Sequence, residues 1–132
     1  MNHRTITVVL PAPAPDVFAY LSSIENLPDW ATDFAQELKV VEGRHKVVNG
    51  LGEFFFRIAA DERSGVVDMY AGPTEDEMAI FPARVVALPG GGSLLTFTMF
   101  QAPGAPFDQF DGQYWSLLSE MDNIRHRFGA AA

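Results

Sequence analysis

Apolar residues recur along almost the whole chain, and changes in their period mark the expected elements. Residues 5–10 are mostly β-branched and predict a first strand. Pro13 and Pro15 suit a helix start, because the first helical turn has no use for the N–H that proline lacks. Helical spacing of apolar side chains then predicts a helix over residues 14–22, and the proline of "ENLPDW" predicts a second short helix that ends near Phe34.

Beyond this helix pair the apolar period changes to two, which is typical of strands with one buried face. Turn signals divide the region at Asn49-Gly50, at Ser64-Gly65 and at "PGGGS". Pro82 lies inside "EMAIFPARVVAL" and indicates an edge position or a bulge. These spacings predict an antiparallel meander of about six strands after the helix pair.

The last segment has the longest helical period. Apolar side chains recur every three or four residues from Phe107 to Phe128. Asp108 lies near the start and Arg127 near the end, as the helix dipole favours, and Gly129 suits a helix terminus. The pattern predicts a long C-terminal helix.

One packing accounts for this order of elements. A curved antiparallel sheet of about seven strands wraps the long C-terminal helix, and the two short helices after the first strand close one end. The predicted class is α+β with a helix-grip arrangement, in a single domain over residues 1–132. A curved sheet and a straight helix diverge away from their contact, so we expect a cavity between them, lined by phenylalanine and methionine.

Composition and charge narrow the possible partners. The chain has 132 residues with 17 acidic and 9 basic side chains, for a net charge of -8. That balance argues against nucleic acid and anionic membrane surfaces as partners. The chain has no cysteine, which excludes disulfides and thiolate metal sites. No apolar run reaches the roughly 20 residues that cross a bilayer, so we expect no membrane insertion and a cytoplasmic location.

The opening motif "PAPAPDVFAYLSSIENLPDWA" resembles the START/polyketide-cyclase-like superfamily of helix-grip proteins, also called the birch-pollen-allergen fold. The residues that match its pattern are Val17, Phe18, Leu21, Asn26, Leu27, Pro28 and Trp30. "GVVDMYAG", "ARVVALPGGGSLLTFTMFQAPG" and "FDQFDGQYWSLLSEMDNIRHRF" resemble later strands and the final helix of a small-protein branch, so the resemblance covers nearly the whole chain. It implies the fold and leaves function open, because the superfamily includes lipid carriers, aromatase/cyclases, hormone receptors and stress-response proteins.

The candidate ligand-binding residues are those expected to face the cavity or to anchor a polar group in it. They are Trp30, Phe34, Phe54, Phe56, Asp68, Met69, Tyr70, Arg84, Phe97, Met99, Tyr114, Leu118 and Met121. The aromatic and methionine positions suit either an internal pocket or a solid core, and Trp30 and Phe34 are expected near the entrance. Asp68 and Arg84 suit either an anchor for an acidic lipophile inside the cavity or an outward cross-strand pair.

The sequence favours binding over catalysis. The histidines lack metal-binding spacing, no Ser-His-Asp set is present, and neither a metal nor a cofactor is expected. The leading hypothesis is a carrier or sensor that holds a lipid-like or polyaromatic molecule. The alternative is a polyketide cyclase or aromatase, with Tyr70, Tyr114, Asp68 and Arg84 as the candidate acids and bases.

A third hypothesis is a structural partner protein. Phe55 and Phe81 lie on the strand parity opposite the predicted core face. They predict an exposed apolar patch for a homodimer.

Overall fold

The computed structural model describes residues 1–129, and residues 130–132 of the predicted domain lie outside the described residues. The elements in chain order are β1 (His3–Leu10), α1 (Ala14–Ser22), the 3₁₀ turn η1 (Ile24–Asn26), α2 (Leu27–Trp30), β2 (Glu37–Val41), β3 (Arg44–Asn49), β4 (Gly52–Asp61), β5 (Val66–Gly72), β6 (Ala79–Phe81), β7 (Ala83–Ala87), β8 (Ser93–Phe100) and α3 (Phe107–Arg127). The predicted α+β helix-grip class is confirmed.

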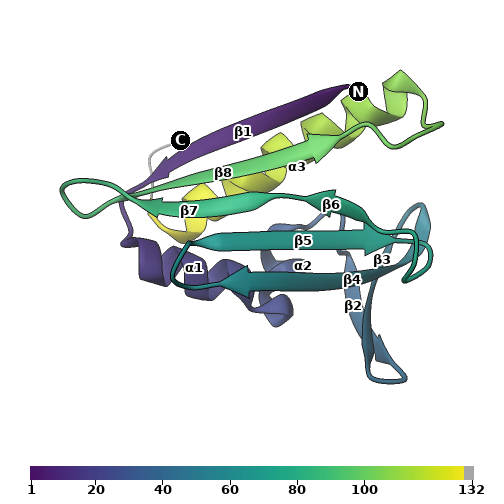
Figure 1. The fold of residues 1–132 in the computed structure, drawn as a ribbon, viewed down its shortest axis with the longest axis horizontal. Coiled ribbons are helices and arrows are strands. Elements are labelled where there is room, and N and C mark those ends of the chain that lie inside the picture. The colour runs from purple at the N-terminus through teal and green to yellow at the C-terminus, as the bar shows by residue number, and fades with distance from the viewer. Residues whose placement is uncertain (130–132) are drawn as a thin grey trace.

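The strands form one antiparallel sheet in the order β1-β8-β7-β5-β4-β3-β2, and β6 pairs with β5. The first strand therefore lies beside the last, with Ile6 opposite Phe97. In Figure 1, α3 runs alongside β1 and β8, whereas α1 and α2 lie toward β4. None of the helices in residues 1–129 is long and apolar enough to cross a membrane.

Two predicted elements differ from the structure. The strand expected around Pro82 is two strands, because proline has no N–H for the ladder and the chain changes partner there. β6 pairs with β5, Pro82 accepts a hydrogen bond from the Thr98 N–H at 2.9 Å, and β7 pairs with β8. The second short helix ends at Trp30 and does not reach Phe34, because the N–H groups of residues 33 and 34 bond to a side chain of α3.

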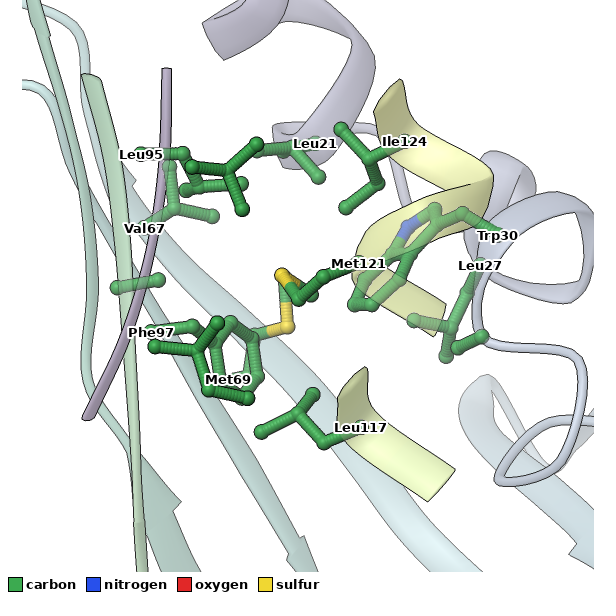
Figure 2. Packing of buried hydrophobic residues seen from close by; sticks show 14 of the residues in the cluster. Leu21, Leu27, Trp30, Val67, Met69, Leu95, Phe97, Leu117, Met121 and Ile124 are labelled. Atoms are coloured by element: carbon green, nitrogen blue, oxygen red, sulfur yellow. The ribbon is translucent and has the colours of Figure 1, made fainter. Parts of the chain in front are cut away.

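The core fills the space between the sheet and the C-terminal half of α3. Figure 2 shows Val67, Leu95 and Phe97 from the sheet pointing toward Met121 and Ile124 from α3. Met121 and Ile124 have no exposed surface. Side chains therefore close this end of the sheet–helix interface completely, and any open space must lie toward the other end of α3.

Arg4 fixes the N-terminal half of α3 against β1. Its Nη1 lies 2.8 Å from Asp111 Oδ1, and its guanidinium group lies 4.4 Å from the ring centre of Tyr114 and 5.2 Å from that of Phe110. A cation over aromatic faces is attractive, and the half-buried setting strengthens the ion pair. The start of α3 is thus tied to the edge of the sheet.

Candidate functional site

A cavity of about 380 Å³ lies between the sheet and the N-terminal half of α3. It opens to solvent beside the turn between β3 and β4, where Leu51 is 71% exposed. The residues that line it are Leu27, Trp30, Ala31, Asp33, Phe34, Asn49, Gly50, Leu51, Phe56, Met69, Phe81, Phe97, Met99, Gln109, Gly112, Gln113, Ser116, Leu117 and Glu120.

Five aromatic rings make a continuous apolar wall. Ring centres lie 6.2 Å apart for Trp30 and Phe97, 6.3 Å for Phe97 and Phe81, 6.5 Å for Phe81 and Phe34, and 5.7 Å for Phe34 and Phe56. The rings come from three strands, β4, β6 and β8, and from the segment around α2, so tertiary packing assembles them. Tilted and edge-on pairs of this kind are the geometry that aromatic quadrupoles favour.

The opposite side of the cavity is polar. Gln109, Gln113, Ser116 and Glu120 follow one another at steps of three or four residues along α3, which places them on one face of the helix. The cavity therefore has an apolar wall on the sheet side and hydrogen-bonding groups on the helix side.

Glu120 is the most unusual of these groups. The residue is only 4% exposed. Its Oε2 accepts hydrogen bonds from the backbone N–H of Asp33 at 3.2 Å and of Phe34 at 3.1 Å. Burial raises the pKa of this carboxyl to about 7; the two N–H donors oppose that rise, and the charge of Asp33 adds to it. The carboxyl therefore keeps its proton to higher pH than an ordinary glutamate does.

The rim segment over residues 31–35 is held from both sides. Glu120 and Asn123 hold it to α3, since Asn123 Nδ2 donates to Thr32 Oγ1 at 3.1 Å and to the preceding Trp30 carbonyl at 2.9 Å. Asn49 holds it to the other rim: its Nδ2 donates to the Phe34 carbonyl at 2.8 Å and its Oδ1 accepts from the Leu51 N–H at 2.9 Å. Hydrogen bonds thus hold the rim segment to both neighbouring elements at the mouth of the cavity.

The structure divides the thirteen candidate residues into three groups. Those that line the cavity are Trp30, Phe34, Phe56, Met69, Phe97 and Met99. Met121 is buried in the core away from the cavity, and Phe54, Leu118 and Tyr114 pack against that core from partly buried positions. Asp68, Tyr70 and Arg84 lie on the outer face of the sheet, because Val67, Met69 and Ala71 occupy the inner face of β5 and Val85 that of β7.

Asp68 and Arg84 therefore do not anchor a ligand in the cavity, which corrects one of the two alternatives. Arg84 lies opposite Val66 and donates from Nε to the Ser64 carbonyl at 3.1 Å. Tyr70 lies under the Arg57 guanidinium, 3.9 Å from its ring centre. No ion pair joins Asp68 to Arg84 within residues 1–129, so the outward pair is not formed either.

The predicted dimer patch is also wrong in one of its two residues. Phe81 lines the cavity, because it lies directly opposite the inward-facing Met69. The strand parity continues through Pro82, because Ala83 and Val85 of β7 also face inward, so a count started from Val85 places Phe81 on the inner face. Phe55 does lie outward, half-buried under the Lys46 ammonium group at 4.5 Å.

The sequence reasoning missed Glu120 and the polar face of α3. A signal was present, because Leu117, Glu120 and Ile124 have the i, i+3, i+7 spacing of a buried helical stripe. A glutamate on such a stripe is either paired or exposed to an internal space.

Comparison with known proteins identifies the fold. The similar solved structures include XoxI from Bacillus cereus (13% identity, TM-score 0.75, covering 97% of this chain and 96% of that one) and a START superfamily protein from Mycobacterium smegmatis (15%, 0.68, 96% and 97%). The di-domain ARO/CYC BexL from the BE-7585A biosynthetic pathway is also similar (14%, 0.72), over 96% of this chain and 46% of that one. The fold is START-like.

The START-like resemblance read from the opening motif is confirmed at the level of fold. No model of a known protein family matches the sequence, and no curated protein matches it either. At these identities the structural likeness concerns the fold alone.

Proposed function

We propose that this protein binds a hydrophobic small molecule in the cavity between its sheet and α3, as a carrier or sensor. The observation that carries the proposal is the open space beside the five-ring wall. Its volume of about 380 Å³ falls in the range of small-molecule sites. Aromatic and methionine side chains on that wall offer a ligand an apolar surface that excludes water.

The binding proposal can be tested with one substitution at two places on α3. Ser116 is half-buried and lines the cavity, whereas Ser119 is exposed on the solvent side of the same helix. Ser116→Phe adds a ring at the cavity wall, and Ser119→Phe adds the same ring outside it. The fluorescent lipophile N-phenylnaphthylamine serves as the probe in a titration.

The wild type and Ser119→Phe should bind the probe alike, with one saturable site. Ser116→Phe should weaken binding by about tenfold or more, because the added ring takes up space and apolar contact that the probe needs. Equal binding by all three proteins would place the probe outside the cavity. No binding by the wild type, together with no co-purified lipophile in native mass spectrometry, would refute the proposal.

A second candidate function is proton-transfer catalysis of the cyclase type. The four acid–base candidates expected from the sequence do not line the cavity, but Glu120 does. A carboxyl with a pKa of about 7 suits general acid–base chemistry near neutral pH. Nitrobenzisoxazole, which opens when a base removes its ring proton, tests for this reactivity; turnover that Glu120→Gln abolishes would support it, and the absence of turnover would count against it.

A further inference from the structure

The charges that face the cavity are all of one sign. Asp33 and Glu120 are its acidic residues, and no lysine, arginine or histidine of residues 1–129 lines it. The chain as a whole carries a net charge of -8. A cation approaching the mouth is therefore attracted, and an anion is repelled.

The two carboxyl oxygens of Glu120 are in different situations. Oε2 accepts both backbone hydrogen bonds from the rim segment. Oε1 has no hydrogen-bond partner among residues 1–129. In that part of the chain, Ser93 Oγ is the only fully buried side-chain polar atom without a partner, so Oε1 is not fully buried. Oε1 thus retains contact with open space, and since the residue is 4% exposed and lines the cavity, that space is the cavity.

We propose that the cavity selects lipophilic amines, with the ligand's ammonium group donating a hydrogen bond to Glu120 Oε1 and its apolar body against the aromatic wall. This inference rests on the proposed binding function and specifies its ligand class. The geometry fits because Glu120 lies on the helix side of the cavity and the rings lie on the sheet side. An amphiphile with one polar end spans the two.

The alternatives fit less well for electrostatic reasons. A carboxylic acid ligand would bring a third negative charge to Asp33 and Glu120 without a basic side chain to receive it. A neutral alcohol could donate to Oε1, but its hydrogen bond to a carboxylate lacks the charge on the donor. An ammonium group also favours the ionised form of Glu120, so binding of the cation and ionisation of the carboxyl support each other.

The chain contains a suitable reporter for the test. It has two tryptophans: Trp30 is 3% exposed in the cavity wall, and Trp115 is 63% exposed on the outside of α3. Trp115→Phe leaves Trp30 as the single fluorophore. In this background, decylamine, decanol and decanoic acid can be titrated at pH 8 below their micellar concentrations, since none of them absorbs with tryptophan.

We expect decylamine to bind about tenfold more tightly than decanol, and decanoic acid to bind most weakly, as a charge-assisted hydrogen bond in a partly buried site implies. Glu120→Gln keeps an acceptor for the two rim N–H groups and removes the charge. It should bring the affinities of amine and alcohol to within about twofold of each other. Asp108→Asn is the matched control: it removes an exposed charge at the start of α3 and should leave the amine preference unchanged.

The wild-type cavity provides a second measurement that needs no substitution at Glu120. The titratable groups facing this cavity are Asp33 from the segment after α2 and Glu120 from α3; the lining residues of the β3–β4 turn and of the sheet carry none. The amine preference should therefore fall between pH 8 and pH 5.5 as Glu120 takes up a proton.

The possible failures are distinguishable. Equal affinities for amine and alcohol at pH 8, or an amine preference that survives Glu120→Gln or is the same at pH 5.5, would overturn the inference and leave the binding function standing. Failure of all three probes to bind would overturn both.

Discussion

Glu120→Gln should stabilise the folded protein by an amount that grows as the pH rises from 4.5 to about 7 and is constant at higher pH. Burial raises the folded-state pKa of Glu120 from its ordinary value of 4.5 to about 7. The stability that belongs to a group with a raised pKa is fully present below the unfolded value and is lost as the pH rises through the folded value. The difference between the two pKa values corresponds to about 3 kcal/mol, which the wild type should lose between pH 4.5 and pH 8.

Glutamine removes this loss because it stays neutral at every pH and keeps an oxygen for the N–H groups of Asp33 and Phe34. The free energy of unfolding, measured in urea, should be similar for variant and wild type at pH 4.5. At pH 8 the variant should be more stable by up to about 3 kcal/mol. Taking the difference between the two proteins cancels the titration of all other groups. Glu62→Gln, in an exposed turn, is the control and should change little at either pH.

A variant that is less stable than the wild type at pH 8 would refute the reasoning. It would mean that the charge on Glu120 strengthens the two rim hydrogen bonds by more than burial penalises it. A difference that does not change with pH would mean that Glu120 titrates near its ordinary pKa, and hence that water reaches it freely.

Three further substitutions test packing elsewhere, each by urea unfolding. Ser93→Ala should stabilise the protein by about 1 kcal/mol, because it removes a fully buried hydroxyl without a partner; a loss would reveal a hydrogen bond at that oxygen. Gly112→Ala should also stabilise by about 1 kcal/mol, since the added methyl in α3 meets only open space. Gly65→Ala should cost about 3 kcal/mol or more, because φ is +76° and the added Cβ would lie 2.0 Å from the Val85 carbonyl oxygen; an unchanged midpoint would mean that the turn can move.

The sequence correctly predicted the helices whose bounds depend on residues within the helix itself. The helix predicted over residues 14–22 has those bounds in the structure, because its prolines and its apolar period act within the segment itself. α3 begins at Phe107 and is followed by Gly129 with φ +74°, as its apolar period and terminal glycine indicated. Phe56, Met69, Phe97 and Met99, which line the cavity, were found through strand alternation, whereas Trp30 and Phe34 were expected near the entrance from the opening helix pair.

Two of the predictions that were wrong concern the face on which Phe81 lies and the residue at which α2 ends. Phe81 was assigned to the wrong face although it shares its parity with the inward-facing Ala83 and Val85, so alternation counted back from Val85 would have placed it inside. The end of α2 depends on Glu120, whose carboxyl accepts the rim N–H groups from a helix far along the chain. Residue type alone predicts that a glutamate is exposed. Only the position of Glu120 on the buried stripe of α3 indicates that it is buried.

The two oxygens of Glu120 connect cavity and rim through a single side chain. Any molecule that changes the charge on Oε1 also changes the acceptor strength of Oε2, so the amide hydrogens of Asp33 and Phe34 act as built-in reporters of occupancy. Their exchange with deuterium should slow when a cation fixes the carboxyl in its ionised form. The coupling is reciprocal: if a bound cation strengthens these two hydrogen bonds, a substitution that breaks them must lower the affinity for the cation.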